Sequence, residues 1–451
     1  MMTKTQLGKL GLFDAKAPRY TSYPTALHFA GDVGPSDFSS WISKIEPDSR
    51  VSLYIHIPFC RRLCWFCACR TQGTQSDAPV NAYLESLKAE LTLLGQNLPE
   101  GVTLSRLHWG GGTPTLLSAP QMTELAAAVR AMAPFNADTE FSVEIDPNEI
   151  DTARLDALHT AGMTRASIGV QDFDPRIQKC IGRIQGYDTT KDAALALRAH
   201  GIKGLNADIL FGLPYQSKAR ITESVQKLLS LNPDRIALYG YAHVPWVAKR
   251  QQMIPSGALP TPEERLELFE TAQRLFLWDG YKAVGIDHFA QADDGLSRAQ
   301  EAGTLRRTFQ GYTDDTAEVL IGVGASSISR FPQGYAQNAH ATGAHTAAIR
   351  AGNFSTERGH MFTGEDKMRA RIIEALMCDF RVDTAAICDQ FKVSRTTVQK
   401  ILRRANDTFA GLLTLNSSGL FIPKEVRPLT RMIAQSVDAY EMSVEGHSSA
   451  I

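Results

Sequence analysis

Residues 54–70, YIHIPFCRRLCWFCACR, place four cysteines within ten positions, directly after an apolar run. That run, VSLYIHI (51–57), is rich in β-branched and aromatic residues and predicts a buried β-strand. Five similar runs follow, with helical-period segments between them: LSRLHWG (104–110), EFSVEI (140–145), RASIGV (165–170), LNADIL (205–210) and RIALYG (235–240). Six strand-helix repeats predict a parallel sheet, either doubly wound or curved into a full or partial barrel.

Local signals mark the ends of the intervening helices. Ser118 is followed three residues later by a glutamine at capping-box spacing, and Asp151 and Asp188 are also predicted to start helices. Gly162 and Gly201 are predicted to end them.

Chemically distinctive motifs follow the predicted strands. They are the four cysteines, then GGGTPT (110–115), Glu144 with Asp146, VQDF (170–173), DILFGLP (208–214) and YAHVP (241–245). Loops leaving the carboxyl ends of parallel strands converge on one face, where ligands bind. The sequence therefore predicts a single site at this rim.

The flanking regions have a different pattern. PRYTSYPTALHF (18–29) is aromatic and aperiodic, which favours an arm laid on another surface. After about residue 345 helical patterns dominate, with a helix-turn-helix in 383–405 and a hairpin in LLTLNSSGLFI (412–422). We therefore expect an arm (1–35), a barrel (36–345) and a mainly helical, winged-helix-like domain (346–451) that caps the substrate.

Composition favours an ordinary globular chain. Lysine and arginine number 47 against 48 acidic residues, giving a formal charge of −1, so nothing in the balance predicts a polyanion or a membrane as partner. No apolar run is long enough for a signal core or a membrane span, and we expect a cytoplasmic protein. Of the seven cysteines, Cys180, Cys378 and Cys388 lie apart and are expected to be small buried residues.

The clustered cysteines allow three interpretations. A structural zinc site usually needs a second pair of ligands after a longer loop, and none follows. A redox dithiol would use Cys64 and Cys67 and leave Cys60 unexplained. An iron-sulfur cube held by Cys60, Cys64 and Cys67 would leave its fourth iron open to an external ligand.

The third pattern resembles the signature of the radical S-adenosylmethionine (SAM) superfamily, because CxxxCxxC with the aromatic Phe66 follows the first strand of an α/β domain. Eight segments in order then resemble one family, the oxygen-independent coproporphyrinogen III oxidases, over about residues 18–340: PRYTSYPTA, YIHIPFCxxLCxFCxC, LHWGGGTPT, VEIDP, GVQDF, NPDRIALYGYAHVP, DHFA and FQGYT. The paralogous haem chaperones share the barrel but lack the equivalents of Cys69 and FQGYT. This chain has both.

The resemblance implies a partial parallel (β/α)6-type barrel and two kinds of cofactor, a [4Fe-4S] cluster and two SAM molecules. It implies that a 5′-deoxyadenosyl radical takes a hydrogen from the β-carbon of a propionate, which then loses carbon dioxide and one electron to become a vinyl group. Two such steps convert coproporphyrinogen III to protoporphyrinogen IX without oxygen. They need a one-electron donor and a terminal electron acceptor, and we expect a monomer.

The matching positions give the implied site residues. The cluster ligands are Cys60, Cys64 and Cys67. The residues implied to bind SAM are Tyr54, Phe66, Gly111, Gly112, Thr113, Glu144, Gln171, Arg183, Asp208, Ala242 and Ile328, and of these Tyr54 and Glu144 are also predicted to be catalytic. Their types suit the ligand, since Asp208 can accept from ribose hydroxyls, Arg183 can bind a carboxylate and Glu144 an ammonium group.

Other assignments stay open at the level of sequence. A substrate with four propionates needs cationic groups, and Arg19 and Arg330 are candidates by type alone. FQGYT (309–313) and the arm are expected to close the site. Cys69 is either a buried or loop thiol or a residue on the substrate side.

Two alternative functions follow from the same sequence. A haem-binding chaperone would keep the fold without decarboxylation. A DNA-binding winged helix would use the basic residues Lys392, Arg395, Lys400, Arg403 and Arg404, although acidic neighbours dilute this cluster and nucleic acid is not the partner we expect.

Overall fold

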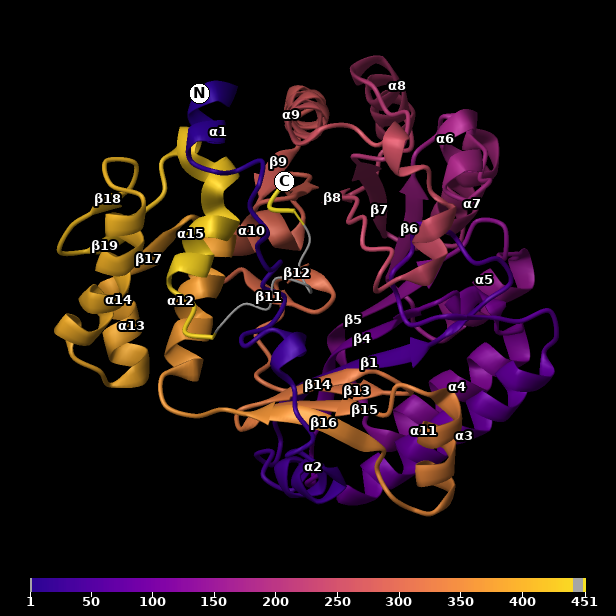
Figure 1. Ribbon diagram of the computed structural model, residues 1–451. Coiled ribbons are helices and arrows are strands. Elements are labelled where there is room, and N and C mark those ends of the chain that lie inside the picture. Colours follow the sequence, from indigo (N-terminus) through magenta and orange to yellow (C-terminus); the bar gives the residue numbers. More distant parts are fainter. Residues whose placement is uncertain (1, 441–448) are drawn as a thin grey trace.

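The computed structural model describes residues 2–440 and 449–451, and a twelve-stranded mixed sheet lies at its centre (Figure 1). Seven neighbouring strands are parallel: β13 (Leu320–Val323), β1 (Arg50–Ile57), β4 (Thr103–Gly111), β5 (Phe135–Ile145), β6 (Arg165–Gln171), β7 (Gly204–Phe211) and β8 (Arg235–Gly240). All six predicted strands are therefore confirmed, and β13 is an additional one. The strand order does not close on itself, as a partial barrel requires.

Antiparallel strands extend the sheet at both edges. Beyond β13 lie β14 (Ile328–Phe331), β15 (Gly334–Asn338) and β16 (Thr356–Met361), and beyond β8 lie β10 (His288–Ala290) and β9 (Lys282–Val284). The sheet thus continues to Met361, past the residue near 345 at which the sequence pattern turns helical.

Helices surround the parallel strands (Figure 1). They are α2 (Pro35–Ile42), α3 (Ala78–Asn97), α4 (Ala119–Met132), α5 (Thr152–Thr160), α6 (Pro175–Cys180), α7 (Tyr187–Ala199), α8 (Lys218–Leu229), α9 (Pro262–Trp278), α10 (Gly295–Ala302) and α11 (Thr342–Arg350). Along β4 and β5 fully buried residues such as Trp109 and Phe141 alternate with half-buried polar residues such as His108 and Glu144. Since alternate side chains point to opposite faces, the apolar set forms the core and the polar set lines the opposite face.

The helix boundaries follow most of the sequence signals. Asp151 caps α5 by accepting from the N–H of Arg154, and the Ser118 N–H donates to Gln121 at the start of α4. Gly162 and Gly201 follow the ends of α5 and α7 with positive φ. The prediction for Asp188 is wrong, because α7 begins at Tyr187 with Gly186 as its N-cap.

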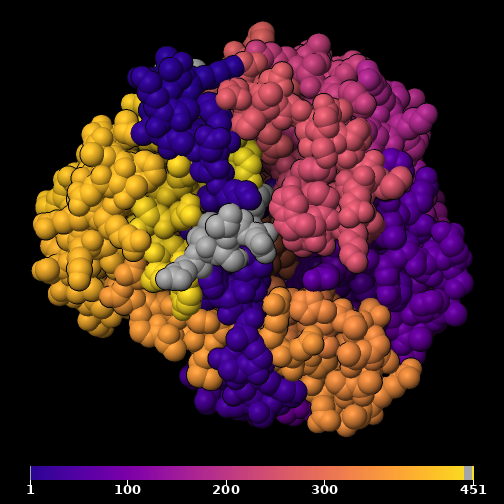
Figure 2. Space-filling model, viewed as in Figure 1, coloured from indigo at the N-terminus to yellow at the C-terminus, as the bar shows by residue number. Residues whose placement is uncertain are grey.

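A second hydrophobic core joins the two ends of the chain. Leu7, Leu12, Tyr20 and Tyr23 from the N-terminal segment, which includes α1 (Lys4–Lys9), are buried with apolar residues from 368–450. The Tyr20 hydroxyl donates to Asp438 at 2.9 Å. Figure 2 shows this segment as an indigo band between the yellow C-terminal region and the barrel.

The C-terminal region contains a helix-turn-helix and a small sheet. Its elements are α12 (Asp366–Asp379), β17 (Arg381–Asp383), α13 (Thr384–Phe391), α14 (Arg395–Thr408), β18 (Thr414–Leu415), β19 (Gly419–Phe421) and α15 (Thr430–Ser436). The hairpin predicted in 412–422 is confirmed as β18 and β19. Within the residues described, none of the helices is long and apolar enough to cross a membrane.

Candidate active site

The cysteine loop leaves the carboxyl end of β1 and is held on two sides. It is framed by β2 (Phe59–Cys60), which pairs with β3 (Gln72–Gly73). The Trp65 N–H donates to the carbonyl of Ile181 at 2.8 Å, and Gln251 Nε2 donates to the carbonyl of Phe66 at 2.8 Å. Arg250 adds a hydrogen bond to the Cys69 carbonyl at 3.3 Å. The loop is therefore a fixed platform.

Cys60, Cys64 and Cys67 are free, half-buried thiols on this loop. Burial raises the pKa of Cys60 to about 11, whereas hydrogen bonds from Cys69 lower the pKa of Cys67 in spite of its burial. Among the described residues no three His, Cys, Asp or Glu side chains are grouped for one metal ion. A [4Fe-4S] cube does not require the three thiolates to converge on one ion, because each thiolate binds a different iron. Three free thiols on one rigid loop fit this arrangement.

Arg183 connects this loop to the sheet. Its Nη1 lies 3.5 Å from the sulfur of Cys64, and its Nη2 donates to the carbonyl of Gly169 at 2.8 Å. Its Nε is buried and has no hydrogen-bond partner in the structure. Because an unpaired buried donor is costly, this guanidinium is suited to an anionic ligand such as a carboxylate.

The glycine run packs directly against the cysteine loop. The N–H groups of Gly112 and Thr113 donate to the carbonyls of Ile57 and Phe59, each at 2.8 Å. A Cβ at Gly112 would lie 2.5 Å from the Phe59 oxygen, and one at Gly110 would lie 2.7 Å from a Glu144 oxygen. Only glycine leaves this space open, so the run forms a backbone cradle beside the thiols.

Glu144, His108 and Tyr54 form a connected group on the inner face of β5, β4 and β1. Glu144 accepts from the Gly111 N–H at 3.1 Å and lies 3.4 Å from His108 Nε2, while Tyr54 stacks on His108. Burial tends to raise the pKa of Glu144, but His108 and the Gly111 N–H outweigh it and hold the pKa below its ordinary value. The carboxylate is thus ionised and available to a cation. Burial, with Glu144 nearby, raises the pKa of Tyr54 well above its usual range.

The remaining predicted residues extend around the rim. Asp208 lies on β7, where burial and the charge of Glu144 raise its pKa to about 7 against an opposing effect of Arg183. Gln171 ends β6 in the left-handed region, with φ of 67°. Ala242 follows β8, and its carbonyl accepts from Gln251 at 3.0 Å.

Ile328 comes from a different part of the sheet. It starts β14, beside β13, whose Gly322 pairs with Tyr54 of β1. The predicted cofactor residues thus lie on β1, β4, β5, β6 and β7 or on the loops that follow β1, β4, β6 and β8, while Ile328 begins β14.

Sequence reasoning missed two contributors to this site. His108 contacts both Glu144 and Tyr54, although no role was assigned to it from the sequence. Its polar side chain between the apolar residues Leu107 and Trp109 was a usable signal in the sequence for the polar face. Gln251, which bonds to both Phe66 and Ala242, carried no signal, because it lies in an irregular segment far along the chain.

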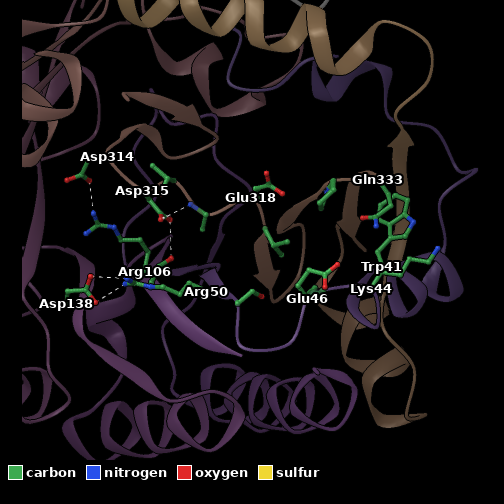
Figure 3. A pocket seen from close by; sticks show the side chains of 17 residues that line it. Trp41, Lys44, Glu46, Arg50, Arg106, Asp138, Asp314, Asp315, Glu318 and Gln333 are labelled. Atoms are coloured by element: carbon green, nitrogen blue, oxygen red, sulfur yellow. Dashed lines mark hydrogen bonds and ion pairs between the residues drawn. The ribbon is translucent and has the colours of Figure 1, made fainter. Parts of the chain in front are cut away.

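Two cavities adjoin the barrel. One, of about 730 Å³, lies where β1 begins and is rich in carboxylates; Figure 3 shows Arg50 bound to Asp138 and Arg106 bound to Asp314 within it. The other, of about 310 Å³, is lined by the arm, β14, β15, α12 and His108. The second cavity therefore adjoins the predicted cofactor residues.

Comparison with known proteins agrees with this geometry. Residues 54–228 match the model of the radical SAM superfamily. The fold and the three-cysteine site thus define a radical SAM protein, whose cofactors are a [4Fe-4S] cluster and SAM.

Relatives from other organisms identify the family within this superfamily. The chain is 62% identical to the oxygen-independent coproporphyrinogen III oxidase of Paracoccus denitrificans over the full length of both. It is 35% identical to the enzyme of that name from Escherichia coli, covering 95% of this chain and 94% of the relative. The solved Escherichia coli coproporphyrinogen III oxidase, a radical SAM enzyme, superposes with a TM-score of 0.89 over 94% of this chain and 98% of that one. The chain belongs to the oxygen-independent coproporphyrinogen III oxidase family.

Proposed function

We propose that the protein converts two propionate side chains of coproporphyrinogen III to vinyl groups without oxygen, giving protoporphyrinogen IX in haem biosynthesis. The observation that carries the proposal is the juxtaposition of three free thiols on a rigid loop with the glycine cradle and the ionised Glu144. Family membership supports the same reaction.

The chain's own residues bind and orient the cofactors. Cys60, Cys64 and Cys67 would hold the cluster, and Glu144 with the backbone of Gly111 and Gly112 would receive the amino-acid end of SAM. Asp208 would accept from ribose hydroxyls, and the open Nε of Arg183 would donate to a carboxylate.

When bound, the reduced cluster and SAM supply a 5′-deoxyadenosyl radical that removes one hydrogen atom from the propionate β-carbon. For each propionate, carbon dioxide leaves and one electron passes to an external acceptor. A one-electron donor, a terminal acceptor, a cytoplasmic location and a monomeric chain are parts of the proposal.

An anaerobic assay tests the function. Reconstituted protein given coproporphyrinogen III, SAM, a reductant and an electron acceptor should form 5′-deoxyadenosine and a divinyl product. Haem binding without either product would support the chaperone alternative. The presence of Cys69 and of FQGYT (309–313) favours the enzyme.

A further inference from the structure

The cavity of about 310 Å³ lies between the N-terminal arm, the barrel and α12. The arm contributes Tyr20–Tyr23, and the hairpin of β11 (Arg306–Thr308) and β12 (Gly311–Thr313) forms another wall. His108 also lines the cavity, and the same imidazole lies 3.4 Å from Glu144 and stacks on Tyr54. A molecule in this cavity would therefore lie next to the predicted cofactor site.

The cavity is lined by more cationic than anionic side chains. The cations are Arg106, Arg306, Arg307, Arg330, Lys367 and Arg371, and the carboxylates are Asp315, Glu318 and Glu374. Two of the cations are neutralised within the protein: Arg106 binds Glu140 and Asp314, and Arg371 binds Glu374. Arg306, Arg307, Arg330 and Lys367 therefore supply the excess of positive charge in the cavity.

Arg307 is the deepest of these. Its side chain is only 3% exposed, and its Nε and Nη1 are buried without any hydrogen-bond partner in the structure. Its nearest carboxylate is that of Asp287, at 3.8 Å from Nη2, and Asp287 already binds His288 Nδ1 at 2.7 Å. Packing over the ring of Tyr312, at 4.5 Å, fixes the guanidinium plane.

Two unsatisfied donors on a buried guanidinium are rare in native proteins and point to an acceptor from outside the chain. Arg330, on β14, is half-buried, and its side chain has no hydrogen bond or ion pair among the residues described. Both residues line the same cavity, so one molecule in it would lie beside both.

We propose that Arg307 and Arg330 bind two propionate carboxylates of the tetrapyrrole and thereby hold its other side chains toward the cofactor site. This inference rests on the proposed function and adds to it the residues that recognise the substrate. The unpaired N–H groups of a guanidinium donate charge-assisted hydrogen bonds to a carboxylate in fixed directions, which the ammonium group of Lys cannot reproduce. The cavity of Figure 3 shares Asp315 and Glu318 with this one but has more carboxylates than cationic side chains, so it suits the same ligand less.

Steady-state kinetics and equilibrium binding test the proposal. Loss of a charge-assisted hydrogen bond costs about 1.5–3 kcal/mol, which is about 10- to 100-fold in affinity. We expect Arg307→Gln and Arg330→Gln each to raise the KM for coproporphyrinogen III by about this factor. Arg307→Lys should recover only part of the loss, and Arg350→Gln, an exposed substitution on α11, should change nothing.

A binding cycle separates recognition from damage to the fold. Fluorescence titration measures the affinity for coproporphyrin III and for its tetramethyl ester, which carries no carboxylates and undergoes no turnover. Wild-type protein should prefer the acid about 10-fold or more, and each Gln variant should lose most of this preference. If Arg307→Gln does not fold, Arg330→Gln decides the outcome alone.

The outcomes distinguish the two proposals. Wild-type turnover together with an unchanged acid preference in both Gln variants would overturn the assignment of Arg307 and Arg330 and leave the function standing. Absence of divinyl product from wild-type protein that still binds the acid through these arginines would instead overturn the function.

Discussion

Asp208 carries an unfavourable charge within the candidate site. It is a carboxylate on β7 whose pKa is raised to about 7 by burial and by Glu144. Folding therefore favours its neutral form, although binding of ribose hydroxyls uses the oxygens of the ionised form as acceptors. The protein thus keeps a group at this position that weakens the fold, which is typical of ligand sites.

This residue predicts a pH-dependent stability. Asp208 is ionised in the unfolded chain above about pH 4 and in the folded chain only above about pH 7, so its penalty appears between these values and is constant above them. We expect Asp208→Asn to raise the free energy of unfolding of the cofactor-free protein by up to about 4 kcal/mol at pH 8. Denaturant unfolding of the wild-type and variant proteins at pH 8 and pH 4 measures this gain in stability. An equal gain at both pH values would contradict the raised pKa of Asp208.

Substitution of individual cysteines tests which thiols bind the cluster. Cys64→Ala should abolish the brown chromophore of anaerobically reconstituted protein, because it removes a cluster ligand. Cys69→Ser should keep it, since Cys60, Cys64 and Cys67 remain and the backbone N–H of residue 69 can still donate to Cys67 Sγ, at 3.4 Å. Absorption spectra and iron content measure both, and loss of iron in both variants would show that the ligand set is wrong.

Individual residues were predictable where a motif fixed them. The cysteine spacing and the glycine run place the predicted site on the loops that follow β1 and β4. Arg307 was not predictable, although it lies two residues before FQGYT, because nothing in the letters RRTFQGYT distinguishes a buried guanidinium from a solvated one. Its significance appears only when its neighbours leave two nitrogens without partners.

The turn after β4 shows how a short element shapes the site. Gly111 has φ of 114°, and the next two N–H groups bond to the chain on either side of Pro58. The cradle and the cysteine loop are therefore one unit, and a side chain inserted between them should disturb both.

Glycine substitutions test this coupling. Gly112→Ala places a Cβ 2.5 Å from a backbone oxygen that cannot move freely, and it should cost about 1–3 kcal/mol and weaken SAM binding. Gly343→Ala, in α11 with no atom within 4 Å of its new Cβ, should instead stabilise by about 0.5 kcal/mol. Thermal unfolding and SAM titration measure both; equal behaviour of the two variants would disprove the coupling.

Elements were predictable in proportion to their length and regularity. β8 has the bounds that its sequence predicts, and β5 begins five residues earlier than EFSVEI, at Phe135. The antiparallel strands β14 and β15 were missed, because runs of four and five residues beside Gly and Pro carry little periodic signal. Asp188 was misassigned because the cap is Gly186, two positions earlier.

At the scale of the whole molecule, two hydrophobic cores support one site. The first lies between the sheet and its helices, and the second unites the arm with the C-terminal helices. The arm links them, since Arg19 donates to the Gly240 carbonyl at the end of β8 at 2.6 Å while Tyr20 binds Asp438. Sequence reasoning placed the arm on another surface but had no means of identifying that surface.

A cavity created in the second hydrophobic core should destabilise only the elements that pack in that core. Leu12 is 0% exposed, and Leu12→Ala should cost about 2–5 kcal/mol. Hydrogen exchange should rise in α12 and α15, which share this core, and stay unchanged in β4 and β5. Uniformly faster exchange in all four elements would show that the two cores unfold together.

The partnership of Tyr20 with Asp438 spans 418 positions of the chain. Closing so long a loop costs chain entropy, so this contact depends on the second hydrophobic core, which holds both segments in place. The cavity wall formed by Tyr20–Tyr23 is therefore fixed by residues far along the chain from the cysteine loop, and loss of this single hydrogen bond should loosen it.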